Sequence, residues 1–396
     1  MQKKLLYILF GLLPFSGSIF AQQNPDKVWN QNIHTVLIHP VGEALGAPIY
    51  MMSNGTPLLI SFDDFAAQYQ DYYFSVELMD SVWNPISMNS FEYLKGFNEN
   101  KITQFSVSSI AAQKYFHYQF TFPDNNVSPK LSGNYIIKVY KDNNKDNLVF
   151  TRRMYVVDPV ASVATNILEP FDGAISKTHQ RISVNVDCRN IPSFQNDRIT
   201  VKVIQNNRYN DPQTVTTPSF IRNTILEFNN ESELLFPAGK EARWLDLQSL
   251  RLRSDRVAEI DNKGNIVTVT VKPDISRMNM GYLSYKDLNG NFLISNTESL
   301  QNETQNDYAE VLFTYLPQDH IPYLDKRLYL SGALTNNSLD PQSEMRFNAQ
   351  LGLYQKRLLL KQGYYSYNYI LRDRLEPNAM EDFAFTEGDH GETENN

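Results

Sequence analysis

Short runs of alternating apolar and polar residues dominate the chain from about residue 30 onward. Examples are PLLISFDD, YYFSVELMD and GNYIIKVYKD, with Gly, Pro, Asn and Asp between them. A period of two predicts β-strands, and strands at short intervals with turn residues between them predict antiparallel sandwiches. We therefore expect a mainly β protein built from tandem immunoglobulin-like β-sandwich domains, with few and short helices.

The strand pattern pauses twice, which divides the chain into units. It restarts after Asp158-Pro159, and a polar stretch at Asn296–Asp307 has the composition of a linker or an exposed loop. These pauses predict three sandwiches, at residues 30–158, 159–298 and 305–396. Each unit has the length of an ordinary domain.

The N-terminus has the pattern of a secretory signal peptide. Lys3 and Lys4 precede an apolar stretch, Leu5–Leu13, and Ile19-Phe20-Ala21 forms a cleavage site. Residues 1–21 are therefore predicted to be removed. No later stretch approaches the roughly 18 apolar residues of a spanning helix, so we expect an exported protein with no membrane span of its own.

Charge narrows the choice of partners. Removing residues 1–21 takes away two lysines and no acidic residue, so 34 basic side chains face 44 acidic ones, a net charge of −10. Nucleic acid is disfavoured as a partner of such an acidic chain.

The residue types that carry chemistry are sparse. Cys188 is the single cysteine and ends an alternating strand pattern, ISVNVDC, so we expect it on a buried strand face rather than as a reactive thiol. The six histidines are scattered, and Asp63 and Asp64 are adjacent, so they diverge on a strand. Neither a zinc site nor a nucleophile motif is indicated. We expect no catalytic residue, cofactor, metal or small-molecule ligand.

One acidic stretch imitates a calcium loop. Asp142–Asn147, DNNKDN, begins like one but lacks the glycine at the sixth position, and Arg153 stands where a bidentate Glu is needed. We interpret it as the tip of a hairpin.

A long series of segments goes beyond a generic sandwich. Within Leu58–Ser109 the chain reads Ser-Phe-Asp-Asp, Asp-Tyr-Tyr, Trp-Asn-Pro and then Glu-Tyr-Leu-Lys-Gly-Phe-Asn-Glu-Asn, and later come SGNYIIKVYKD, FTRRMYVVDP, SLRLRSDRV and NDYAEVLFTYLP. In this order the segments resemble the plug proteins of the type IX secretion system, over nearly the whole mature chain. No single segment is a chemical motif, and the specificity lies in the series.

The resemblance implies a function without catalysis. It implies a periplasmic protein that associates with the outer-membrane β-barrel translocon of this secretion system and closes its periplasmic opening. Blocking a wide pore needs a shape-matched surface and loops rather than an active site.

The candidate contact with the barrel is a polar turn in the first unit. It consists of Lys95, Gly96, Phe97, Asn98, Glu99, Asn100 and Lys101. A loop that merely fixes the first sandwich is an equally good interpretation of the same residues.

The third unit raises two questions. Its Tyr365, Tyr367 and Tyr369 share one strand face, and the unit is similar to the sandwich modules of glycogen-processing enzymes. Those modules carry tryptophans on the sugar face and this unit has none, so we interpret the tyrosines as core, with a cell-envelope glycan-binding protein as the alternative function.

Family members continue into a further strand, so this unit is either truncated or naturally short. We therefore expect an exposed edge on its last strand, which ends at Asp373.

Overall fold

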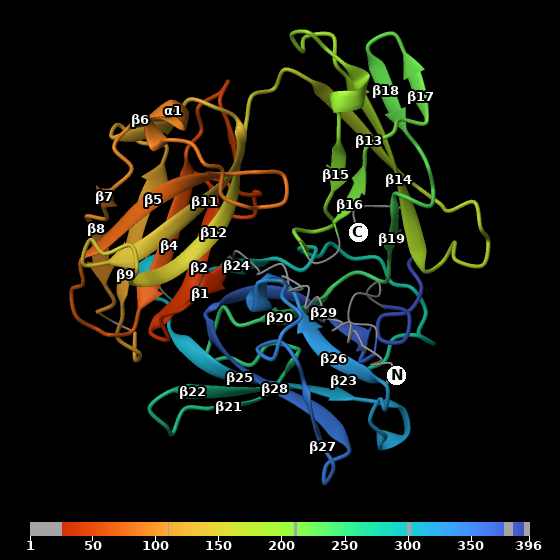
Figure 1. Ribbon diagram of the computed structural model, residues 1–396. Helices are drawn as coiled ribbons and strands as arrows, with labels where there is room; N and C mark the ends of the chain where they lie inside the picture. Colours follow the sequence, from red (N-terminus) through yellow and green to blue (C-terminus); the bar gives the residue numbers. More distant parts are fainter. Residues whose placement is uncertain (1–25, 110, 210–211, 299–301, 376–382, 392–396) are drawn as a thin grey trace, which may run out of the picture.

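The chain folds into three β-sandwich units with very little helix (Figure 1). The computed structural model describes residues 26–109, 111–209, 212–298, 302–375 and 383–391. The predicted signal peptide, residues 1–21, lies outside these residues. The mainly β fold expected from the alternating pattern is confirmed.

The first unit is a sandwich of two main sheets. Its elements are β1 (Lys27–Val28), β2 (Ile33–Pro40), β3 (Ile49–Met51), β4 (Leu58–Asp64), β5 (Tyr72–Met79), α1 (Ser90–Tyr93), β6 (Leu94–Gly96), β7 (Asn100–Lys101), β8 (Gln104–Val107), β9 (Phe116–Phe122), β10 (Val127–Pro129), β11 (Gly133–Lys141) and β12 (Leu148–Val157). One sheet has the order β1-β12-β11-β5-β7 and the other β2-β4-β9-β8. Alternate residues such as Ile60, Phe62 and Ile137 are fully buried between the sheets, as a period of two requires. Residues 142–147 form the tip between β11 and β12, as predicted.

The second unit has the smallest core. Its elements are β13 (Ser162–Leu168), β14 (His179–Asp187), η1 (Asn196–Arg198), β15 (Val201–Val203), β16 (Gln213–Val215), β17 (Phe220–Arg222), β18 (Ile225–Phe228) and β19 (Leu235–Pro237). A five-stranded sheet, β13-β14-β18-β17 with β19 beside β14, accompanies the β15-β16 pair. Val184, Val186 and Cys188 lie in the core, so the predicted burial of the cysteine is confirmed.

The third unit is a sandwich of a four-stranded and a six-stranded sheet. Its elements are β20 (Arg243–Asp246), β21 (Val257–Asp261), β22 (Val267–Val271), β23 (Asp274–Ile275), β24 (Phe292–Ile294), α2 (Asn302–Gln305), β25 (Tyr308–Leu316), η2 (Gln318–His320), β26 (Lys326–Ser331), η3 (Ala333–Thr335), β27 (Arg346–Asn348), β28 (Leu353–Lys361) and β29 (Gly363–Asp373). In the smaller sheet β29 lies between β20 on one side and β24 and β26 on the other, and the larger sheet has the order β21-β22-β25-β28-β27, with β23 beside β25.

The strand pairings move the second unit boundary from the predicted residue 298 to the turn after β19. The strands β20 to β24, residues 243–294, belong to the sheets of β25 and β29 rather than to those of the second unit. The described parts of the polar stretch that resembled a linker, residues 296–298 and 302–307, lie within the third unit. Asn296 donates to Asn306, which is fully buried and donates in turn to the carbonyl of Gln362 at 3.0 Å.

The expected exposed edge is wrong for the first part of the last strand, which has a partner strand on both sides. Tyr364 and Tyr365 of β29 pair with β20 on one side and with β24 on the other, and β26 continues the second side to Asp373. This part of β29 is central because its partners β20 and β24 lie within residues 243–294, which the sequence pattern places in the second unit.

Candidate functional site

Half of the turn predicted as the contact site, residues 95–101, is structural. Gly96 has a φ of +94°, and a Cβ there would lie 1.8 Å from the Asn126 carbonyl oxygen, so only glycine fits. The Asn98 side chain accepts from the Val76 N–H at 2.7 Å and donates to the Val76 carbonyl at 2.8 Å. This amide thereby continues the hydrogen-bond ladder between β5 and β7 beyond the end of β7.

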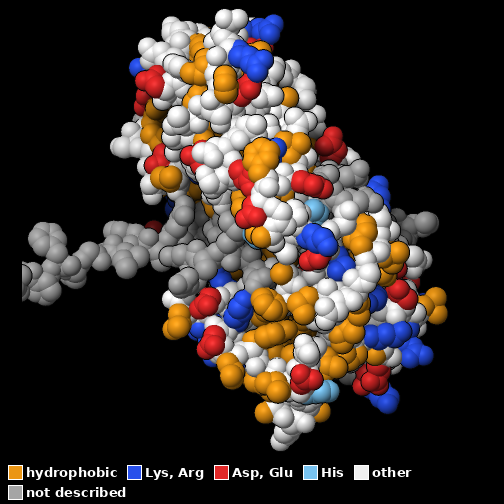
Figure 2. Space-filling model, turned by 90° about the vertical axis from the view of Figure 1, so that its right-hand side faces the viewer, with side chains coloured by type: hydrophobic (Ala, Val, Ile, Leu, Met, Phe, Trp, Pro, Cys, Tyr) orange, Lys and Arg blue, Asp and Glu red, His pale blue; other side chains and the backbone are white. Residues whose placement is uncertain are grey.

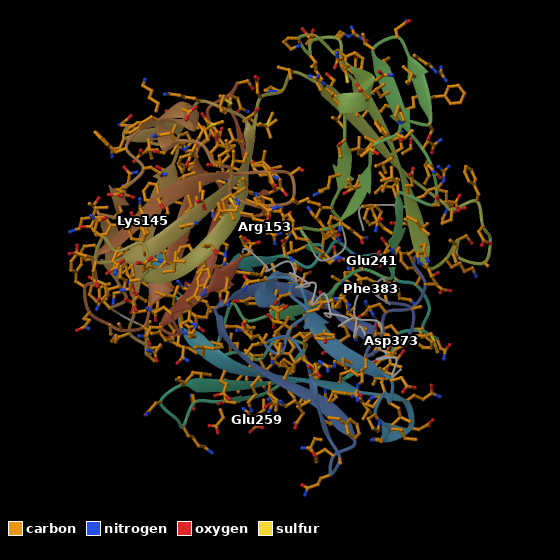
Figure 3. All side chains as sticks on the ribbon, viewed as in Figure 1. Lys145, Arg153, Glu241, Glu259, Asp373 and Phe383 are labelled. Atoms are coloured by element: carbon orange, nitrogen blue, oxygen red, sulfur yellow. The ribbon has the colours of Figure 1, made fainter. Side chains whose placement is uncertain are left out.

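The other half of the turn faces solvent. Phe97 is 74 % exposed, although an aromatic ring of this size is usually buried. Glu99 pairs with Lys145 at 2.7 Å and Lys101 with Asp71 at 2.6 Å, both on the surface. Lys145 lies on the side of the first unit that faces away from the other two (Figure 3). The turn therefore presents one apolar ring flanked by charges on an open side of the molecule.

A buried ion cluster joins the first unit to the third. Asp63 on β4 accepts from Lys361 on β28 at 2.6 Å and from Tyr308 on β25 at 2.5 Å, while His117 on β9 lies 2.7 Å from its other oxygen. All four side chains are buried. We call these residues the Asp63 cluster.

Adjacent Asp64 points the other way, as predicted for neighbours on a strand. It accepts from the buried Tyr72 hydroxyl inside the first sandwich at 2.9 Å. β4 thus places Asp64 in the core of its own sandwich and Asp63 against the third unit.

The charges of the Asp63 cluster are mutually compensated. Burial would raise the pKa of Asp63, but the Lys361 ammonium and the hydrogen bond from His117 outweigh burial and hold that pKa below its ordinary value. Burial raises the pKa of Tyr308 far above its usual range, and Asp63 adds to the rise, so this hydroxyl stays protonated and donates.

Further contacts surround the Asp63 cluster. The Tyr115 hydroxyl donates to the Asn306 carbonyl at 2.8 Å, and the Ala112 N–H donates to Asp307 at 2.5 Å. Tyr115 and Tyr308 pack together edge to face, with Phe65 against both. An aromatic layer therefore shields the ions from water on the first-unit side.

The second unit contacts both of the others. Arg153 of the first unit lies 3.7 Å above the ring of Tyr209, and Lys202 donates to the Ser81 carbonyl at 2.9 Å. On the other side, His390 of the third unit donates its backbone N–H to the Lys177 carbonyl at 3.0 Å. The three units thus form a closed ring of contacts rather than a string, with Arg153 at the inner side of the first unit (Figure 3).

A second buried ion cluster lies inside the third unit. Arg243 on β20 donates to Asp274 at 2.9 Å and to Glu387 at 3.1 Å, and Arg277 donates to Glu387 at 2.8 Å. Arg256 also binds Asp274. We call these five residues the Arg243 cluster.

The carboxylates of the Arg243 cluster also accept hydrogen bonds from donors other than arginine. Burial would raise the pKa of Glu387, but Arg243 and Arg277 lower it below its ordinary value. Its Oε1 also accepts from the Tyr369 backbone N–H at 2.8 Å. The segment that carries Glu387, Phe383–Gly391, is thereby held against the third sandwich.

The tyrosine-rich strand belongs to this cluster and to the core. Tyr365, Tyr367 and Tyr369 are at most 2 % exposed. The hydroxyls of Tyr367 and Tyr369 each donate to Oδ2 of Asp274 at 2.9 Å. The prediction that these rings are core is confirmed, and no ring of this face is open to a sugar.

A cleft at the junction of the second and third units is too small for an organic ligand. It is lined by Arg208, Lys240, Asn289, Gly332, Asn337 and their neighbours, and it holds about 40 Å³. That is the space of one or two water molecules.

Apolar side chains gather over the third unit on the face shown in Figure 2. Exposed ones in this unit include Met280, Leu283 and Phe385, at 45 %, 69 % and 50 %. The Ser276 hydroxyl donates to the Phe385 carbonyl at 2.6 Å, so the segments that carry them lie together.

The described residues also bear on metal binding and on membrane insertion. No group of three or more His, Cys, Asp or Glu side chains among them is placed to hold a metal ion. None of their helices is long and apolar enough to cross a membrane.

Comparisons with known proteins match the first unit to a family and the whole chain to a solved structure. Residues 33–158 match the family described as type 9 secretion system plug protein 1st domain. A crystal structure of a hypothetical protein from Parabacteroides merdae is 28 % identical, covers 92 % of this chain and 91 % of its own, and superposes with a TM-score of 0.87. No curated protein matches the chain.

Proposed function

We propose that the chain is the periplasmic plug of the type IX secretion translocon. The match of residues 33–158 to the first domain of the type 9 secretion system plug proteins supports a role in this secretion system. In this role the mature protein, after loss of residues 1–21, closes the periplasmic opening of the outer-membrane β-barrel. The family match carries the proposal.

The closed ring of units supports a plugging role. A plug must keep its shape against the opening, and three sandwiches joined pairwise resist bending better than three joined only in sequence. The Asp63 cluster and the contacts of Arg153 and His390 supply these joints. Interfaces between domains of one chain otherwise allow relative motion.

The proposed contact with the barrel includes the exposed half of the turn at residues 95–101. A single exposed aromatic ring flanked by charges is the usual form of an interface anchor with a polar rim. Phe97 provides the ring, while Lys95, Glu99 and Lys101 are its charged neighbours along the turn. Gly96, Asn98 and Asn100 hold the turn in shape.

The plug function is tested by deleting the gene and measuring uptake of a bulky antibiotic that the outer membrane normally excludes. We expect sensitivity to rise on deletion, because the barrel stays inserted and open. The same deletion in a strain without the barrel gene should show no such rise. Unchanged sensitivity, or an equal rise without the barrel, contradicts the proposal.

The contact turn is tested by isolating a tagged barrel from cells that carry Phe97→Ser. We expect at least a tenfold loss of co-isolated protein with an unchanged unfolding curve, because Phe97 is largely exposed. Leu252→Ser, which removes a 76 % exposed apolar side chain from the third unit, is the matched control and should bind normally. Equal binding by both variants assigns the turn a structural role only.

A further inference from the structure

The second unit ends in a sheet edge that lacks the usual protection. β13, residues Ser162–Leu168, pairs with β14 alone and forms one edge of the five-stranded sheet. Its seven residues, SVATNIL, contain no charge and no proline, and the pairing register runs without a bulge. Natural sheets usually blunt long edges with lysines, prolines, bulges or covering segments.

Other edges of the molecule carry such protection. β2 has a bulge between His34 and Leu37 and ends at Pro40. β21 has a bulge and two acidic residues, and β26 is covered by the segment around Glu344. Edge strands β1, β7, β17 and β27 have only two or three residues each. Edge strand β8, residues Gln104–Val107, is also uncharged and regular but has only four residues. Among the described edge strands, β13 is exceptional in being long, regular and uncharged.

The outer side of β13 is open. Residues 162–166 are all exposed, and Val163 is 63 % exposed. Outside its ladder with β14, none of the backbone hydrogen bonds found in the described part of the chain involves β13. In an antiparallel pair every second residue turns its N–H and C=O away from its neighbour, so those groups face water here.

The two faces of β13 specify the strand that would fit beside it. Val163 and Thr165 pair with the buried Val186 and Val184, so they stand at the rim of the core. Ala164 and Asn166 pair with the polar Asn185 and Ser183 on the other face. A strand that covers this edge must therefore alternate apolar residues, which extend the core, with polar ones.

We propose that β13 binds an extended, uncharged segment of the secretion barrel, which adds to the sheet as a sixth strand. The choice of the barrel as the partner rests on the proposed function. Strand addition of this kind obtains its affinity from main-chain hydrogen bonds and its specificity from alternate side chains.

A second copy of this chain is the less suitable occupant. Each mature copy carries a net charge of −10, so two copies repel one another. Seven residues span only about 23 Å of edge, which cannot bury the roughly 800 Å² per partner of a stable dimer. The edge therefore suits one part of a larger interface, such as the one proposed for the barrel.

The test is amide hydrogen exchange of the full-length mature protein, alone and in complex with the co-isolated barrel. Strand addition predicts at least tenfold slower exchange for alternate amides of residues 162–168 in the complex. Contacts through side chains alone would not slow them. Normal co-isolation without this protection overturns the inference and leaves the plug proposal intact, whereas absence of co-isolation overturns both.

Variants at Val163 give a second measurement. Val163→Lys places a charge at the rim of the core, where the added strand needs an apolar partner, and should reduce barrel co-isolation at least tenfold. Val163→Thr keeps the β-branched shape and should reduce it less than threefold, and Leu252→Lys controls for an added charge elsewhere. Circular dichroism checks the fold. Equal co-isolation by the two Val163 variants, or protection of β13 that arises from self-association of the isolated protein, contradicts the proposal.

Discussion

The Asp63 cluster and the Arg243 cluster are built from the same kinds of groups but have different functions. In each, tyrosine hydroxyls and cations converge on carboxylates that are fully buried. The Asp63 cluster has one carboxylate and connects two units, whereas the Arg243 cluster has two and connects segments of a single unit. A buried ion pair contributes little net stability compared with an apolar pair but requires its partner, so each cluster fixes which surfaces can meet.

The largest effect is expected from Glu387→Gln. The amide keeps the shape but removes the charge. Arg277 then loses the carboxylate that it binds, and Arg243 keeps only Asp274, which Arg256 also binds. We expect the third unit to lose about 3–5 kcal/mol of unfolding free energy. Urea unfolding, followed by hydrogen exchange of β29, measures this loss. Glu344→Gln is the control, since its pair with Arg327 is 3.5 Å long and largely exposed, and a loss there as large would contradict the role assigned to burial.

Asp63→Asn should have a smaller effect on unfolding but a larger one on shape. Lys361 then loses the carboxylate charge of Asp63 at the boundary of two units, where water can reach the ammonium if the units separate. We expect about 3 kcal/mol of loss and an increased radius of gyration by small-angle scattering, with the first sandwich still folded. Glu310→Gln, which breaks an exposed 2.8 Å pair with Arg357, should change neither quantity. An unchanged radius in Asp63→Asn would mean that the apolar contacts alone hold the units.

Acid should weaken both clusters. The folded-state pKa values of Asp63 and Glu387 lie below those of the unfolded chain, about 3.9 and 4.3. Their stabilisation is therefore fully present above these values and is lost as the pH falls through the folded-state pKa. Urea unfolding at a series of pH values should show a steeper loss below about pH 4 in the wild type than in Asp63→Asn. Parallel curves would exclude Asp63 as a contributor.

The smallest effects are expected from Tyr308→Phe and Tyr367→Phe. Each removes one hydroxyl that donates to a buried carboxylate, and other donors remain on that carboxylate. A loss of about 1.5–3 kcal/mol is expected for each, because a charged acceptor loses a hydrogen bond. Only Tyr308→Phe should also increase the radius of gyration. If both variants increase the radius of gyration, the two clusters do not have the different functions assigned to them.

The sequence predicts the local parts of this structure well. Alternation of apolar residues predicts the strands, the divergence of Asp63 and Asp64, and the burial of Tyr365, Tyr367 and Tyr369. All of these depend only on which way neighbouring side chains point along one strand.

The ion clusters could not be predicted in the same way. Lys361 lies 298 residues after Asp63, and Glu387 lies 144 residues after Arg243. In the segment LLLKQG, nothing in the sequence distinguishes the buried Lys361 from a lysine that faces solvent. The boundary predicted at residue 298 was wrong for a related reason. A polar segment has the composition of a linker, and only its buried partners in the structure show that it belongs to a domain.

The long separation of Asp63 from Lys361 has a consequence for biosynthesis. The first sandwich can be complete while the residue that will neutralise Asp63 has not yet been made. During that interval Asp63 and His117 are hydrated at the surface that will later meet the third unit, which lowers the tendency of that surface to stick to other exposed chains. An apolar residue at this position would give an equally good final interface but an aggregation-prone intermediate. The carboxylate thus acts first as a solubilising group and only later as a joint.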